Sequence, residues 1–229
     1  MSQIDCEGMT TREINQEIRR LIDLGAAEVV VRNPGARHNL GVAILKPARV
    51  VFEGSVGYYC GGMGDGPDIR VRGSAGWGLA ECQMSGTVIV ENNAGNGAAA
   101  SIRGGSVVVR GDAAARAGIS MKGGTLIIGG DCGYMTGFMM QKGMIVIGGD
   151  AGEALGDSMY EGRIFVGGRI RDLGNDAVVQ DPTRDDLKDV QGALGPCGLP
   201  VPPDLKKVVS GRRLWNFDKK ELDIWKAAL

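Results

Sequence analysis

The sequence predicts an all-β fold: a right-handed parallel β-helix of about seven 19-residue coils. An N-terminal α/β cap, made of a helix and short strands, precedes it, and a partly helical C-terminal tail follows. Three observations support this: a residue pattern recurs with a constant period, the recurring positions form apolar columns, and glycine accounts for 39 of 229 residues. The predicted organisation is a cap over 1–47, the β-helix over 48–170 and a docking tail over 171–229.

The repeat is defined by the residue that follows each β-branched run, here called the marker. The markers follow one another at one constant spacing with no insertion, and asparagine replaces glycine once. A period held over seven units is typical of a solenoid whose coils pack only on their neighbours. The markers are Gly54, Gly73, Asn92, Gly111, Gly130, Gly149 and Gly168.

Two columns of strand residues are wholly apolar, at four and at two positions before the marker. Because side chains alternate along a strand, a spacing of two places both columns on one face, which we expect to form the core. The columns are Val50, Ile69, Val88, Val107, Leu126, Ile145 and Ile164, and Phe52, Val71, Val90, Val109, Ile128, Ile147 and Val166. A second apolar stack, at the tenth position after the marker, holds Ile102, Met121, Met140 and Met159. Parallel strands joined in this way favour a right-handed crossover.

The glycine pattern has an alternative interpretation as a phosphate-binding loop. Such a loop occurs once, between a strand and a helix, whereas this pattern returns along the stack and no Gly-Lys-Ser/Thr follows it. We therefore interpret the glycines as corners that need a positive φ or a close backbone approach. The column at the seventh position after the marker holds only Gly or Ala. The predicted structural glycines are Gly54, Gly57, Gly61, Gly130, Gly133, Gly137, Gly149, Gly152 and Gly156.

The strand face opposite the core is also apolar, which predicts that something covers it. The column three before the marker reads Val51, Arg70, Ile89, Val108, Ile127, Val146 and Phe165. Strands that are apolar on both faces are normally covered on both faces. Either the tail of the chain or another subunit could cover this stripe, and the sequence leaves both open. The candidate interface residues are Val108, Ile127, Val146 and Phe165.

A charged column stands one position before the marker. Glu53, Arg72, Glu91 and Arg110 alternate in sign, and opposite charges on neighbouring strands stabilise the register of a sheet. Three glycines continue the column, and we expect them to admit a second backbone at close range: Gly129, Gly148 and Gly167.

The two ends of the chain carry different signals. A capping box at Thr10 and Glu13 begins a helix whose apolar residues recur at helical spacing until Gly25. Two short strands are predicted at 28–32 and 40–45, and together with the helix they would close the open end of the solenoid. In the tail, 181–191 and 218–229 are predicted to be helical.

Composition and single residues argue against several functions. The 26 basic and 27 acidic residues give no excess for nucleic-acid binding, and the five cysteines form no paired framework, so we expect a reduced, cytoplasmic compartment. No stretch is long enough to cross a membrane, and the N-terminus lacks a signal pattern. His38 has no plausible nucleophile partner, so we expect no catalytic, cofactor-binding or metal-binding residue in this chain. Trp77, Trp215 and Trp225 are expected to be packing or interface anchors.

The Gly-x-x-Gly-x-x-x-Gly coils resemble the GXGXG family, which includes the C-terminal β-helical domain of the glutamate synthase large subunit. The resemblance covers most of 48–170, with departures at Asn92, Ala114, Ala80 and Ala99. The flanking segments 9–39 and 206–217 are similar to those of stand-alone GXGXG subunits, with N-methylglutamate synthase as the closest system.

The resemblance implies a structural, non-catalytic subunit of an enzyme complex. It implies two partners, a glutaminase-like (class II amidotransferase) subunit and an FMN-binding subunit of glutamate-synthase type. FMN, with an iron–sulfur cluster as a further candidate, would belong to a partner. The complex would convert methylamine and glutamate into N-methylglutamate and ammonia. The alternatives are the β-helical subunit of formylmethanofuran dehydrogenase, which belongs to the same family, and a free-standing scaffold protein.

Overall fold

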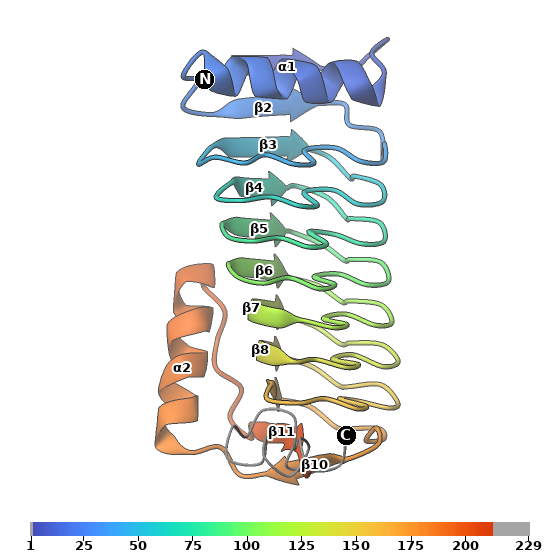
Figure 1. Cartoon of the computed structure of the whole chain (residues 1–229), viewed down its shortest axis with the longest axis vertical. Coiled ribbons are helices and arrows are strands. Elements are labelled where there is room, and N and C mark those ends of the chain that lie inside the picture. The colour runs from blue at the N-terminus through green and yellow to red at the C-terminus, as the bar shows by residue number, and fades with distance from the viewer. Residues whose placement is uncertain (1, 213–229) are drawn as a thin grey trace, which may run out of the picture.

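The computed structural model describes residues 2–212 and consists of stacked coils (Figure 1). One sheet runs the length of the molecule in the order β1-β2-β3-β4-β5-β6-β7-β8-β9-β11-β10. The elements are β1 (Ser2–Asp5), α1 (Thr11–Asp23), β2 (Val29–Arg32), β3 (Arg49–Glu53), β4 (Asp68–Val71), β5 (Thr87–Val90), β6 (Ser106–Val109), β7 (Lys122–Ile128), β8 (Lys142–Ile147), β9 (Arg163–Val166), β10 (Ala177–Gln180), α2 (Arg184–Leu194), η1 (Gly195–Cys197) and β11 (Lys206–Ser210).

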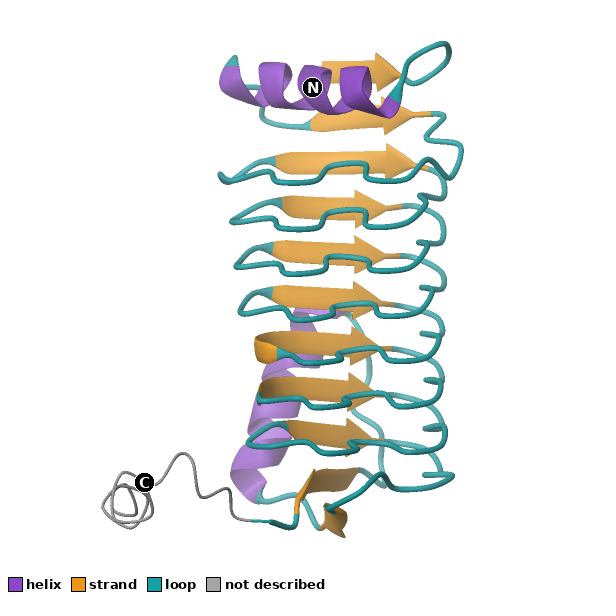
Figure 2. Ribbon diagram, turned by 45° about the vertical axis from the view of Figure 1, so that its right-hand side comes forward, coloured by secondary structure: helices purple, strands orange, loops and turns teal. Residues whose placement is uncertain are grey.

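The predicted β-solenoid is confirmed. Strands β3 to β9 mark seven turns and pair in parallel with a shift of one full repeat, as in Val50 opposite Ile69 and Val107 opposite Leu126. Strands line one side of the stack and loops the other (Figure 2). A second, shorter ladder of single-residue bridges runs from Val56 to Ile170 on the way into the loops.

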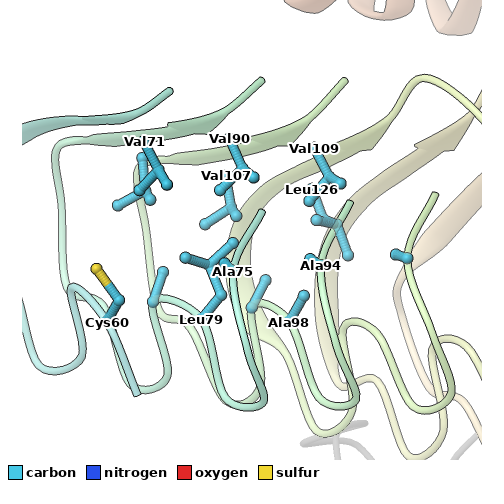
Figure 3. Close-up of a cluster of buried hydrophobic side chains, with 14 of the residues drawn as sticks. Cys60, Val71, Ala75, Leu79, Val90, Ala94, Ala98, Val107, Val109 and Leu126 are labelled. Carbon is cyan, nitrogen blue, oxygen red and sulfur yellow. The ribbon is translucent and has the colours of Figure 1, made fainter. Parts of the chain in front are cut away.

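The core lies inside the coils, where the two predicted apolar columns point. Their side chains belong to one buried cluster that also holds the stack from Ile102 to Met159. In Figure 3, Val71, Val90 and Val109 descend from the strands toward Ala75, Leu79 and Ala98 from the opposite wall. The alanines on that wall leave room for the larger side chains of the strands in the closely packed interior.

The N-terminal end is closed as the sequence predicts, with one error. Thr10 caps α1 through a complete capping box, and Gly25 has a φ of 83° just beyond the helix. Ile14, Ile18 and Ile22 of α1 join the core cluster. The strand at 28–32 exists as β2, but the strand predicted at 40–45 is wrong: residues 40–43 are turn residues.

The prediction at 40–45 is wrong because the first coil of the structure precedes the region in which the sequence repeat is regular. β2 pairs with β3 as in Val29 opposite Val50, a shift that is longer than the repeat by two positions, and this insertion hides the first coil. Within that coil Leu40 and Ile44 point into the core, and Gly41 takes the positive φ of 65° that later coils show at Gly61. The apolar residues of 40–45 alternate around a left-handed corner, and this alternation is the same pattern that predicts a strand.

The predicted structural glycines are needed for two reasons: some adopt a positive φ, and others lie too close to the neighbouring coil to leave room for a side chain. At Gly137 the backbone has a φ of 74°, and an added Cβ would lie 2.6 Å from Cδ1 of Ile164 in the core. At Gly133 an added Cβ would lie 2.8 Å from the backbone nitrogen of Ala115 in the preceding coil. Close contacts or positive φ values also occur at Gly54, Gly57, Gly61, Gly130, Gly149, Gly152 and Gly156.

Replacing Gly137 by valine should lower the free energy of unfolding by about 1–3 kcal/mol, because the branched side chain overpacks the core at a left-handed corner. Chemical denaturation of the purified chain measures this. The control is Gly192→Ala in α2, where an added Cβ meets nothing within 4 Å, and which should be neutral or stabilising. Equal midpoints for Gly137→Val and the wild type would contradict the assignment of this corner.

Candidate interaction surfaces

The four candidate interface residues of the outer stripe are covered by the chain's own C-terminal part. Val108, Ile127, Val146 and Phe165 are at most 1 % exposed. They form a second buried cluster with Val190 and Leu194 of α2 and with Leu205. Figure 1 shows α2 standing beside the sheet, along the lower strands. Of the two alternatives for this stripe, the structure therefore shows cover by the tail, and these side chains offer no open surface to a partner.

Helix α2, which the sequence predicts, is fastened to the sheet by one buried carboxylate. Asp186 accepts hydrogen bonds from Arg163 on β9 and Lys207 on β11, each at 2.9 Å, and from the backbone and hydroxyl of Thr183. Burial alone would raise the pKa of Asp186, but the hydrogen bonds from Lys207, Thr183 and Arg163 outweigh it and hold the pKa well below its usual range. The ionised carboxylate thus joins the helix start to two strands.

Of the three glycines that continue the charged column, only Gly167 lies directly against the segment that follows α2; at Gly129 and Gly148 an added Cβ would meet the backbone of the preceding coil. An added Cβ on Gly167 would lie 2.5 Å from Cβ of Pro202, so the segment after α2 passes directly over this position. A cavity of about 290 Å³ remains between the glycines and this segment, lined by Ile128, Gly129, Val146, Gly148, Gly167, Leu194, Leu199, Pro200, Val201, Pro202 and Pro203. The close approach expected here is an intrachain contact.

The charged column forms ion pairs, although not in the simple alternation that the sequence suggests. Arg32 pairs with Glu53 at 3.2 Å, and Arg110 pairs with Glu91 at 2.9 Å. The second cation near Glu91 is Arg70 from the stripe column, at 3.8 Å. Arg72 is exposed and makes no ion pair within residues 2–212. The Arg32–Glu53 pair is exposed and contributes little to stability, whereas the two pairs of Glu91 are half-buried; all three support the strand register.

Sequence reasoning missed a ladder of aspartates beside the markers. In each of three successive steps a backbone N–H donates to the carboxylate one coil earlier: Asp131 to Asp112, Asp150 to Asp131, and Arg169 to Asp150, at 2.7–2.8 Å. The hydrogen bonds from the Arg169 backbone and side chain lower the pKa of Asp150. The signal was present as a column of short hydrogen-bonding residues one position after the marker: Ser55, Ser74, Asn93, Asp112, Asp131 and Asp150.

His38 belongs to an aromatic stack on the loop side. Its Nδ1 accepts the backbone N–H of Tyr58 at 2.9 Å, and its ring stacks on Tyr58 with a centroid separation of 4.3 Å. Tyr58 in turn stacks on Trp77 at 5.2 Å and 13°. His38 thus holds a loop in place, while Tyr58 and Trp77 remain 46 % and 54 % exposed. Trp215 and Trp225 lie outside the described residues, as does the predicted helix at 218–229.

Large exposed apolar side chains recur along the same loops. We define the loop-side surface as Tyr58, Met63, Trp77, Met84, Tyr134 and Met139, each between 40 % and 54 % exposed. Tryptophan and tyrosine dominate the energetics of protein interfaces, and methionine adapts to partner surfaces. This composition is typical of a surface that another protein covers.

The cysteines are not brought together. All five are free thiols, and burial raises the pKa of Cys60 to about 12. Within residues 2–212, no group of three or more His, Cys, Asp or Glu side chains is placed to hold a metal ion. In the same range, no helix has the length and apolar character needed to span a bilayer.

Comparison with known proteins gives a partial match. The chain is 42 % identical to Protein GlxC of Rhizobium meliloti (strain 1021) over 92 residues, which is 39 % of this chain. The matched part spans about 40 % of that relative's length. No protein-family profile matches the chain.

Replacing Ile127 by lysine should destabilise the isolated chain, because α2 and not a partner covers this position. The loss of burial costs about 1.5–3 kcal/mol, and the uncompensated charge adds to it. Thermal unfolding measures the effect. Val201→Lys, at a position 39 % exposed, is the control and should leave stability nearly unchanged. An Ile127→Lys chain as stable as the wild type would mean that α2 leaves the sheet in solution.

Asp186→Asn should lower the unfolding free energy at neutral pH by about 1.5–3 kcal/mol, the size of a hydrogen bond to a charged group. Because the folded-state pKa is depressed, the contribution of Asp186 is present above the unfolded-state pKa near 4 and is lost as pH falls below it. The deficit of the variant should therefore shrink in acid. The neighbouring Asp185→Asn is the control, since that side chain is 87 % exposed. A deficit that is constant with pH would contradict this role.

Proposed function

We propose that this chain is a non-catalytic structural subunit of a glutamate-synthase-like complex. The loop-side surface is the observation that carries the proposal, because it presents exposed Trp, Tyr and Met side chains on a rigid stack of coils. The GXGXG-like coils and the similarity to Protein GlxC of Rhizobium meliloti support the choice of complex. In this proposal the β-solenoid fixes the distance and orientation of the subunits that carry out the reaction.

The finer assignment is N-methylglutamate synthase, a methylamine–glutamate N-methyltransferase. It rests on the flanking segments 9–39 and 206–217, which resemble those of stand-alone GXGXG subunits. The partners would be a glutaminase-like subunit and an FMN-binding subunit, and FMN would be bound by the latter. The outer stripe is occupied by α2, so the loop-side surface is where we place the contact with a partner.

Co-expression of the chain with the glutaminase-like and FMN-binding subunits tests the proposal. We expect all three to elute together in gel filtration, with flavin absorbance in the complex and N-methylglutamate formed from methylamine and glutamate. Failure of both partners to bind the wild-type chain would refute the assignment. Assembly with molybdopterin-binding and ferredoxin-like subunits instead would favour the formylmethanofuran dehydrogenase alternative.

Trp77→Asp should weaken assembly of this complex by at least about 30-fold, the effect of losing an interface residue worth about 2 kcal/mol. Titration of the purified partner measures the affinity. Leu187→Asp is the matched control, since Leu187 is a 41 % exposed apolar residue on α2, away from the loops. Equal affinities for the two variants would remove the loop-side surface from the proposal.

A further inference from the structure

The C-terminal end of the sheet is uncovered in the part of the chain that the structure describes. β10 is the last strand of the sheet and pairs only with β11, so its other edge has no partner strand within residues 2–212. Val178 and Val179 on β10 are 38 % and 48 % exposed. An open strand edge with apolar side chains favours association with another segment.

Val179 extends the core face beyond the last coil. It lies opposite Val208 of β11, which in turn lies opposite Ile164 of β9. Paired residues on neighbouring strands place their side chains on the same face of a sheet. Val208 and Ile164 are fully buried in the core, whereas Val179 is half exposed. The inner face therefore continues one strand past its cover.

The N-terminal end shows how this fold closes its core. There the last inner-face residue is Ile4 on β1, which lies opposite Val31 of β2. Ile4 is only 4 % exposed and belongs to the core cluster together with Ile14 and Ile18 of α1. An amphipathic helix thus covers the end strand at one end, and the described residues provide no equivalent at the other.

The sequence after the described residues starts beside the open strand. The backbone N–H of Gly211 donates to the carbonyl of Asp176 at 2.7 Å, and Arg212 pairs with the Asp176 carboxylate at 2.8 Å. Asp176 immediately precedes β10. In residues 213–229, Leu222, Trp225 and Leu229 recur at helical spacing. Tethering a segment next to its binding surface gives an effective concentration in the millimolar range, which favours intrachain binding over binding of a separate chain.

We propose that residues 213–229 of the same chain pack on the Val179 face of β10 and close the C-terminal end of the core. The apolar residues of this segment match the exposed valines, and its starting point lies beside the strand that it would cover. This inference does not depend on the proposed function.

Tryptophan fluorescence of the full chain tests the proposal. In a Trp77→Phe background, the emission comes only from Trp215 and Trp225. We expect this emission to be blue-shifted relative to free tryptophan and protected from acrylamide. Val179→Lys should shift it to the red and remove the protection. Val201→Lys, another exposed valine replaced in the same way, should leave both unchanged. Circular dichroism verifies that each variant remains folded.

The same samples identify the other possible occupants of this surface. If the tryptophans of the isolated full chain are fully accessible to acrylamide and do not respond to Val179→Lys, the proposal is overturned. Protection that appears only with a concentration-dependent dimer mass would assign the site to a second copy. Protection that appears only after a partner subunit is added would assign the tail to the complex; both outcomes reject intrachain packing.

Hydrogen exchange provides a second measurement that needs no β10 substitution. In the full chain, the amides of Val178, Val179 and Gln180 should exchange more slowly than in a chain that ends at Arg212. The amides of β5, far from this end, serve as the internal reference. Identical exchange of β10 in the two chains would also overturn the proposal.

Discussion

The stacking of each coil on its neighbours at a fixed shift of one repeat is the constraint on which the rest of the structure depends. Backbone hydrogen bonds join almost every part of a coil to the next, in the strands as well as in the loops. A residue at a given position therefore contacts the residues at the same position one coil above and one below. The residues of one column must therefore pack well against one another, a requirement that an isolated coil would not impose.

The need for equivalent residues of neighbouring coils to pack against one another explains which residue types each column contains. Valine and isoleucine stack on themselves in the core without penalty, and the left-handed column at the seventh position after the marker holds only glycine or alanine, whereas other left-handed positions also hold residues such as Met63, Ser101 and Arg116. A column of aspartates would repel itself, and here the repulsion is offset because each carboxylate of the ladder accepts a backbone N–H from the following coil. Arg169 ends that ladder with an ion pair to Asp150 at 2.8 Å.

The columns are also why so much of the fold could be predicted from sequence. Periodicity identified the core columns, the left-handed corners and the need to cover the outer stripe, since each is a property repeated along the chain. Features that occur once escaped it. The two-position insertion in the first coil produced a false strand at 40–45, and β11 lies between β9 and β10 through antiparallel pairing of distant segments. The attachment of α2 over the stripe includes the ion pairs of Asp186 with Arg163 and Lys207, which no local sequence pattern predicts.

The outer face and the loop side of the solenoid also combine features that repeat in each coil with features that occur once. The outer face is apolar toward the C-terminal end, where α2 covers it, and carries the exposed Arg32–Glu53 ion pair toward the N-terminal end, where α2 does not reach. Within residues 2–212 no helix covers the loop side in this way, and its exposed aromatic residues come from only a few coils. Tyr58 and Trp77 stack on each other because their positions are one repeat apart, and His38 stacks on the other side of this pair through Tyr58, so the solenoid holds two exposed rings in a fixed orientation. A partner that binds there would lose little conformational entropy on the solenoid's side, because the coil backbone has already ordered these rings.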